Sequence, residues 1–69
     1  MNPEESRAKV FTLILAQETA TGMVPDPSWV ACELGVRRAA VCRIYRWLER
    51  DGHLLRTRGA WSLAGRSEQ

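Results

Sequence analysis

The chain has 69 residues, a formal net charge of +2 and 45% hydrophobic residues. A chain this short forms one small domain that buries only about 60% of its unfolded surface, which leaves little room for an enclosed catalytic pocket. The ordinary apolar content also excludes wholesale disorder. We therefore expect one domain over residues 1–63 and a flexible polar tail over residues 64–69.

The first predicted element is a helix that begins at Pro3 and ends near Ala20, with Gly22 just beyond it. Asn2 is a typical capping residue, and Glu5 sits where a capping box places a carboxylate. The apolar face is broad, so it can serve as core alone or as core together with a contact to a second copy. Its apolar positions at helical spacing are Ala8, Val10, Phe11, Leu13, Ile14 and Leu15.

A short extended piece, Met23 and Val24, follows and could form a minimal strand before Pro25. Asp26 and Pro27 then repeat the signal for a helix start, a capping side chain followed by a proline at the first helical position. This second helix is short. It runs through residue 34, and the glycine at position 35 ends it, because glycine adopts the left-handed conformation cheaply.

The third predicted helix begins near Arg37 or Arg38 and runs to about Asp51, where Gly52 stops it. Its apolar residues recur with the spacing i, i+3, i+4 and i+7, so they form one stripe that faces the core. The arginines of this segment fall on the other faces. The stripe consists of Val41, Ile44, Tyr45 and Leu48.

Two short segments, residues 54–57 (LLRT) and 60–63 (AWSL), predict a β-hairpin at the end of the domain. The connection, Arg58–Gly59, has the two-residue length and the second-position glycine that tight hairpins prefer. We expect Leu55, Trp61 and Leu63 to face the helices. The predicted fold is therefore mainly α, with three helices and a small β-hairpin.

The arginines are strongly clustered. Seven of the nine lie in residues 37–58 beside only two acidic residues, which gives this segment a local charge of +5, whereas residues 1–36 carry −3. The guanidinium group suits phosphates and guanine edges. A basic surface on one side of a very small domain is typical of a nucleic-acid binder.

A short helix, a glycine turn and a longer helix with a basic outer face make the arrangement of a helix-turn-helix. The second helix is narrow enough to enter the major groove, and its inner stripe must pack on the domain so that its outer face meets base edges. A following hairpin with arginines at its tip would contact the backbone or the adjacent minor groove.

The segment VACELGVRRAAVCRIYRWLERDGHLL, residues 30–55, resembles the winged helix-turn-helix repressors, which include GntR-like and related bacterial regulators. Their shared pattern is roughly L-A-x-x-L-G-V-S-R-x-T-V-x-R-x-L-x-x-L-E-x-x-G-x-L. The likeness extends from Val30 to about Leu63, half of the chain, and is more specific for the fold than for one family. The residues that match packing positions are Ala31, Leu34, Val36, Val41, Tyr45 and Leu48.

The resemblance also implies roles for individual arginines. Arg38 matches an arginine that touches DNA near the start of the recognition helix, and Arg43 matches a second basic contact. Arg56 and Arg58 lie where hairpin residues, the wing of this family, reach the backbone or the minor groove.

The chain departs from the family pattern at two positions. The usual capping Ser or Thr before Arg38 is Arg37, so the cap of the recognition helix is expected to be weaker or supplied differently. The usual Thr that holds a phosphate is Ala40, so that contact is expected to be lost. Either the additional arginines offset these changes, or the fold has been adapted to another partner.

We expect a sequence-specific, double-stranded DNA-binding protein: a small transcriptional regulator, repressor or accessory factor of the phage or plasmid type, acting as a cytoplasmic homodimer. The alternative is a winged-helix module that docks on an acidic protein partner. Arg50 is expected at the surface, paired with Glu49 or Asp51. The expected DNA contacts are Arg37, Arg38, Ala39, Cys42, Arg43, Arg46, Arg56, Thr57 and Arg58, and the candidate interface residues are Phe11, Leu15, Trp29 and Trp47.

Other functional classes find little support in the sequence. His53 is the only histidine and has no nucleophile or acid at a recognisable spacing, so we expect no catalytic site, no cofactor and no enzyme activity. Cys32 and Cys42 are too few for a disulfide scaffold, and a zinc site needs about four ligands. The longest apolar stretch, Val10 to Ala16, is far too short to span a membrane, and no signal peptide is visible.

Overall fold

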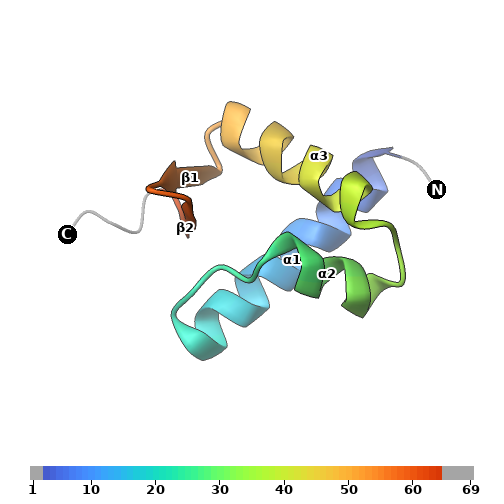
Figure 1. The fold of residues 1–69 in the computed structure, drawn as a ribbon, viewed down its shortest axis with the longest axis horizontal. Helices are drawn as coiled ribbons and strands as arrows, with labels where there is room; N and C mark the ends of the chain where they lie inside the picture. The colour runs from blue at the N-terminus through green and yellow to red at the C-terminus, as the bar shows by residue number, and fades with distance from the viewer. Residues whose placement is uncertain (1–2, 65–69) are drawn as a thin grey trace.

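The computed structural model describes residues 3–64 and contains three helices followed by a two-stranded antiparallel hairpin (Figure 1). This confirms the predicted mainly helical fold with a hairpin wing. The expected Asn2 cap and tail residues 65–69 lie outside the described residues. The elements are α1 (Pro3–Thr21), α2 (Pro27–Leu34), α3 (Arg38–Arg50), β1 (Leu54–Thr57) and β2 (Ala60–Leu63).

Helix α1 contributes Val10 and Ile14 to the core, while Leu15 is 40% exposed. The segment that follows is irregular, so the minimal strand considered at Met23 and Val24 is wrong. A local hydrogen bond explains the difference. The amide of Met23 donates to the hydroxyl of Thr21 at 3.1 Å, which occupies the donor that a strand would offer to a partner.

Helices α2 and α3 end as predicted, each on a glycine in the left-handed region. Gly35 has φ 68°, and Gly52 has φ 89°. After α3, the amide of Gly52 donates to the Glu49 carbonyl at 3.1 Å and that of His53 to the Leu48 carbonyl at 2.8 Å. This pair of bonds is the Schellman arrangement, which satisfies two carbonyls of the last helical turn.

The core lies where the three helices meet the hairpin. Its largest fully buried side chain is Tyr45, whose hydroxyl donates to the Pro25 carbonyl at 2.7 Å and whose ring meets Trp61 edge-on at 5.3 Å between centroids. Burial, with smaller contributions from Asp26 and Cys42, raises the pKa of Tyr45 well above its usual range. The buried hydrophobic residues are Val10, Ile14, Val30, Ala31, Val41, Tyr45, Leu48, Leu54 and Leu63.

Most of the predicted packing positions are confirmed. Val41, Tyr45 and Leu48 are buried along α3, Ile44 packs partly against them, and Ala31 is buried in α2. Two matched positions lie further out than the resemblance implies: Leu34 is only partly buried, and Val36 is exposed.

The register of the hairpin corrects one prediction. Leu54 pairs with Leu63 and both are buried, whereas Leu55, which we expected to face the helices, is 42% exposed. Side chains alternate between the two faces of a strand, so a shift of one residue exchanges the inner and outer sets. Trp61 packs partly against the core, as predicted.

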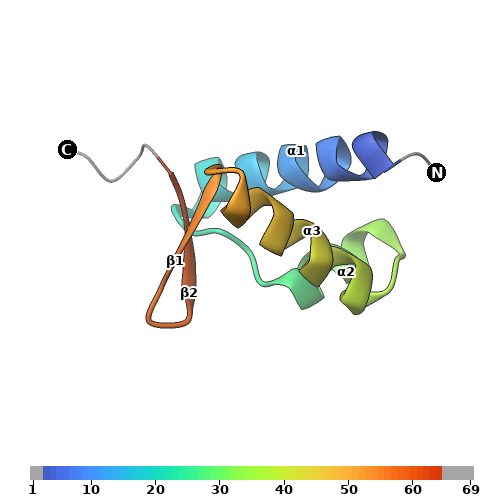
Figure 2. The same ribbon diagram turned by 90° about the horizontal axis from the view of Figure 1, so that it is seen from above.

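Figure 2 shows that the hairpin turn projects on the side of the molecule away from α1. Helix α3 packs against α1, α2 and β1, so it sits between the long first helix and the hairpin. No helix within residues 3–64 combines the length and the apolar character needed to cross a lipid bilayer.

Candidate nucleic-acid interface

The outward face of α3 carries arginines. At 3.6 residues per turn, Arg43, Arg46 and Arg50 lie on one stripe, roughly opposite the buried Val41 and Tyr45. All three arginines are exposed, and no salt bridge within the described residues engages them. Within residues 3–64, neither Glu49 nor Asp51 forms the expected salt bridge with Arg50, and the Asp51 carboxylate lies 3.0 Å from the His53 ring instead.

Arg50 therefore joins the candidate DNA contacts, although its sequence neighbours predict a surface ion pair. The signal that identifies it is the spacing. Ala39, Arg43, Arg46 and Arg50 stand at i, i+4, i+7 and i+11, which is one continuous stripe along a helix. A cation near the C-terminal end of a helix is also favoured by the helix dipole.

The start of α3 has the weak cap that the sequence predicted. Arg37 occupies the capping position with extended backbone angles, φ −74° and ψ 142°, and its side chain makes no capping hydrogen bond. The next residue, Arg38, instead reaches back to α2, where its Nε donates to the Ser28 hydroxyl at 2.7 Å. Ser28 therefore helps to position Arg38, a role that is not evident from the sequence because no local pattern links positions ten residues apart.

The hairpin turn presents Arg58 in an unusual backbone conformation. Arg58 has φ 53° and Gly59 has φ 81°, which is the pair of positive φ values that a type I′ turn requires. Arg58 is the one non-glycine residue with positive φ in the described part of the chain. Both Thr57 and Arg58 are exposed at this end of the hairpin, as the predicted role requires.

A polar hollow of about 310 Å³ lies between α3, the start of α2 and the hairpin. We call it the wing hollow. It gathers four of the predicted DNA contacts, since Arg38, Cys42 and Arg46 come from α3 and Arg56 comes from β1. The other predicted contacts, Arg37, Ala39, Arg43, Thr57 and Arg58, are exposed but do not line it.

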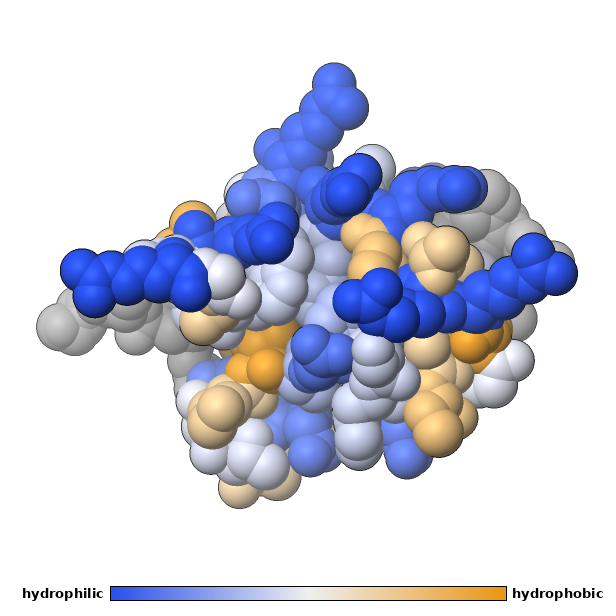
Figure 3. Space-filling model, in the orientation of Figure 1, coloured by the Kyte–Doolittle hydropathy of each residue, from blue (hydrophilic) through white to orange (hydrophobic). Residues whose placement is uncertain are grey.

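Figure 3 shows one face of the molecule with long, strongly hydrophilic side chains gathered over its upper part, where Figure 1 places α3. Apolar side chains appear between and below them. Because Arg43, Arg46 and Arg50 are exposed on this helix, charged groups dominate the surface along α3.

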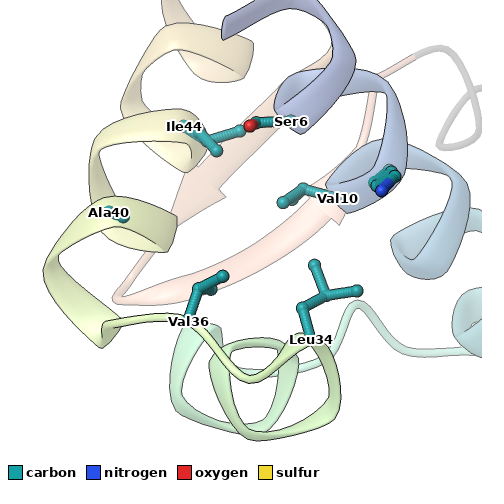
Figure 4. Close-up of a pocket in the computed structure, with 7 residues that line it drawn as sticks. Ser6, Val10, Leu34, Val36, Ala40 and Ile44 are labelled. Carbon is teal, nitrogen blue, oxygen red and sulfur yellow. The ribbon is translucent and has the colours of Figure 1, made fainter. Parts of the chain in front are cut away.

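The opposite flank of α3 has different chemistry. A small hollow of about 120 Å³ lies there between α1, the turn after α2 and α3 (Figure 4). Apart from the hydroxyl of Ser6 and the amine of Lys9, its lining is aliphatic, with Val10, Leu34 and Ile44 among the residues that face it. Lys9 is the one charged residue that lines this small hollow, whereas three arginines line the wing hollow.

The candidate interface residues separate into two groups. Phe11 and Trp47 both lie beside His53, at 5.4 Å and 6.4 Å between ring centroids, and the guanidinium of Arg7 lies 4.1 Å from the Trp47 ring. Trp47 is thus partly covered by α1, although it remains 39% exposed. Leu15 and Trp29, 40% and 36% exposed, take no part in this cluster.

Residues 3–64 contain no group of three His, Cys, Asp or Glu side chains that could hold a metal ion. Both cysteines are free thiols, with Cys32 exposed and Cys42 half-buried. Comparison of the chain with protein-family models, with curated proteins and with solved structures finds no significant match.

Proposed function

We propose that the chain binds double-stranded DNA sequence-specifically and acts as a small transcriptional regulator. In this proposal α3 enters the major groove, and the hairpin lies on the backbone or in the adjacent minor groove. The observation that carries it is the division of α3 into two faces. One face is buried around Val41, Tyr45 and Leu48, and the other presents arginines that form no salt bridge within the described residues.

The dimensions and the support of α3 favour this role. A helix with its side chains is about 10–12 Å wide, and the major groove is about 12 Å wide. The buried hydroxyl of Tyr45 bonds the loop before α2, and the ring of Tyr45 packs on Trp61 of the hairpin. Helix α3 is therefore held from both sides, and a helix held rigidly can place its guanidinium groups against base edges.

A single module of this size buries only about 600–1,000 Å² on DNA, which limits its specificity. We infer that two copies bind an inverted repeat, with half-sites about 34 Å apart, one helical turn. Sedimentation of the protein with a selected duplex should then show two chains per duplex. One chain per duplex would contradict the dimer and leave DNA binding intact.

Selection of bound sequences from random duplex DNA tests the proposal. The wild-type chain should recover a defined motif, and Arg38→Ala and Arg43→Ala should each weaken binding or change that motif. Losing an arginine that contacts a base costs about 1–3 kcal/mol of discrimination. Lys9→Ala is the matched control, because it removes one positive charge from α1 and should leave the motif unchanged.

Salt dependence gives a second readout. If about five arginines each meet a separate phosphate, the logarithm of the binding constant should fall with the logarithm of salt concentration with a slope of about −4 to −5. A flat salt response, or unchanged motif and affinity in both arginine variants, would mean that this surface does not read DNA.

The alternative is docking on an acidic protein partner. Its support is Trp29, a large apolar side chain 36% exposed on α2 that has no ring contact within the described residues. Exposed tryptophans are typical of interfaces. This alternative predicts no mobility shift with any duplex, together with binding to an acidic protein that Trp29→Ala weakens.

A further inference from the structure

The wing hollow brings three arginines together around one concave surface. Arg38 and Arg46 line it from α3, and Arg56 lines it from β1. Asp26 is the one carboxylate among its lining residues, and the Oδ2 atom of Asp26 already accepts the Ser28 amide at 2.8 Å. Three guanidinium groups and one carboxylate leave the hollow with an excess of positive charge.

The direction of Arg56 follows from the register of the hairpin. Leu54 is buried, and residues two apart on a strand point to the same face, so Arg56 also points toward the helices. Its cross-strand partner is Trp61, and the guanidinium of Arg56 lies 5.3 Å from the Trp61 ring. Arg56 is therefore held toward the hollow by a cation–π contact.

Arg38 is held in a comparable way. Its Nε donates to the Ser28 hydroxyl, which fixes the direction of the guanidinium plane and leaves the terminal N–H groups available. Two of the three arginines thus have defined positions before any ligand arrives. Such preorganisation lowers the entropy lost when a ligand is bound.

We propose that the wing hollow is a phosphate-binding site in which Arg38, Arg46 and Arg56 converge on one phosphate group. Guanidinium groups from three directions match the tetrahedral oxygens of a phosphate, and an anion relieves their mutual repulsion. If the chain binds DNA as proposed above, this phosphate is a single backbone phosphate beside the major groove. Arg43 and Arg50, which do not line the hollow, are left for base edges or other phosphates.

The same chemistry could be supplied by a free phosphate ester, so the test has two arms. The first arm measures the salt dependence of duplex binding for the wild-type chain and for the triple variant Arg38→Gln, Arg46→Gln, Arg56→Gln. Each neutralised phosphate contributes about 0.9 to the slope. A shared phosphate predicts that the slope falls by about 0.9, whereas three separate phosphates predict a fall of about 2.7.

The double variant Arg43→Gln, Arg50→Gln is the control for the first arm. It removes two charges from the outward face of α3 and none from the hollow. Any change in its salt-dependence slope therefore reports phosphate contacts outside the hollow. Ethylation of single phosphates in the duplex locates the contact. One modified phosphate should weaken the wild-type chain strongly and the triple variant hardly at all.

The second arm needs no DNA. Inorganic phosphate is titrated into the free protein while the backbone amide resonances of Cys42 and Gly59 and the indole resonance of Trp61 are followed. Saturable shifts that the triple variant loses and the double variant keeps indicate a site for free phosphate. All variants are first checked for an unchanged helical circular dichroism spectrum, so that loss of fold is not mistaken for loss of the site.

The two arms separate the outcomes. A slope change of about 0.9 without phosphate shifts supports the backbone phosphate alone, and saturable shifts without any duplex binding keep the site while contradicting DNA binding. A slope change of about 2.7 with no saturable shifts overturns the hollow as a site and leaves DNA binding standing. Failure to bind both duplex and phosphate overturns both proposals.

Discussion

Helices α2 and α3 begin in opposite ways on nearly the same backbone. The capping residue Asp26 has φ −66° and ψ 145°, and Arg37 has φ −74° and ψ 142°. Asp26 accepts the Ser28 amide at 2.8 Å, whereas Arg37 makes no capping hydrogen bond within the described residues. A positive side chain there also faces the positive end of the helix dipole. The start of α2 thus has the residue that favours helix stability locally, and the start of α3 does not.

The hairpin turn repeats this departure. Four glycines take positive φ values at turns, as expected, but Arg58 does so as well, with φ 53°. For a residue with a Cβ this conformation costs roughly 1–2 kcal/mol. Both departures are arginines at the ends of the basic segment. Residues that remain against local preference are expected to have a role in binding, and substitutions can test that expectation.

The largest effect should come from Tyr45, which links α3 to the loop before α2 and to the hairpin. Tyr45→Ala removes a fully buried ring, and we expect a loss of about 3–5 kcal/mol in the free energy of unfolding. Tyr45→Phe keeps the ring and leaves the Pro25 carbonyl without its donor, so it should cost only about 1 kcal/mol. Urea denaturation of the two variants measures both values. Equal losses would mean that the hydroxyl, not the packing, holds α3.

Alkaline pH should reduce the contribution of Tyr45 to the free energy of unfolding. The pKa of Tyr45 is raised in the folded state, so above about pH 10 the unfolded chain loses a proton that the folded chain keeps. Stability is then present below the unfolded pKa and falls by up to about 1.4 kcal/mol per pH unit above it. Tyr45 is the only tyrosine, so tyrosinate absorbance reports it alone. Tyr45→Phe should remove this part of the pH dependence.

The helix and turn boundaries and the buried stripe of α3 were predictable because their sequence signals are local. Asp26–Pro27, Gly35 and Arg58–Gly59 each mark a boundary that the structure confirms. The wing hollow was not predictable in this way. It depends on the contact of Arg38 with Ser28, ten residues away, and on the inward direction of Arg56, which no short pattern encodes.

The direction of Arg56 depends on which of two neighbouring leucines faces the core. Positions 54 and 55 are both leucine, so composition alone does not say which one faces the core. Choosing Leu55 places Arg56 on the solvent side, and the observed burial of Leu54 turns Arg56 toward α3. Tertiary packing, in particular the buried pair Leu54 and Leu63, decides between the two registers.

The next largest loss of stability should come from removing the Asp26 cap of α2. Asp26→Ala deletes the acceptor of the Ser28 amide, and we expect a loss of about 1 kcal/mol of stability. Asp26→Asn is the control, because it keeps a capping oxygen and should cost much less. Thermal denaturation compares them. If the two variants lose the same amount, the charge of Asp26 matters more than its hydrogen bond.

Supplying the missing cap should act in the opposite direction. Arg37→Ser restores the usual capping hydroxyl and removes a positive charge from the helix start, so stability should rise by about 0.5–1 kcal/mol. Duplex affinity should fall in the same variant, because a candidate phosphate contact is lost. Arg37→Gln separates the two effects, since it removes the charge and adds no favoured cap. A gain in stability without any loss of affinity would mean that Arg37 is not retained for binding DNA.

The hairpin turn offers the smallest and most specific test. Asn precedes Gly in the preferred type I′ turn because Asn tolerates positive φ, so Arg58→Asn should stabilise the chain by up to about 1 kcal/mol. The matched change Arg56→Asn leaves the turn unaltered and should bring no such gain. If Arg58 reaches the DNA backbone, Arg58→Asn should also reduce the salt-dependence slope of binding by about 0.9. A more stable chain with an unchanged slope would place the turn outside the DNA contact and confine the interface to α3 and the wing hollow.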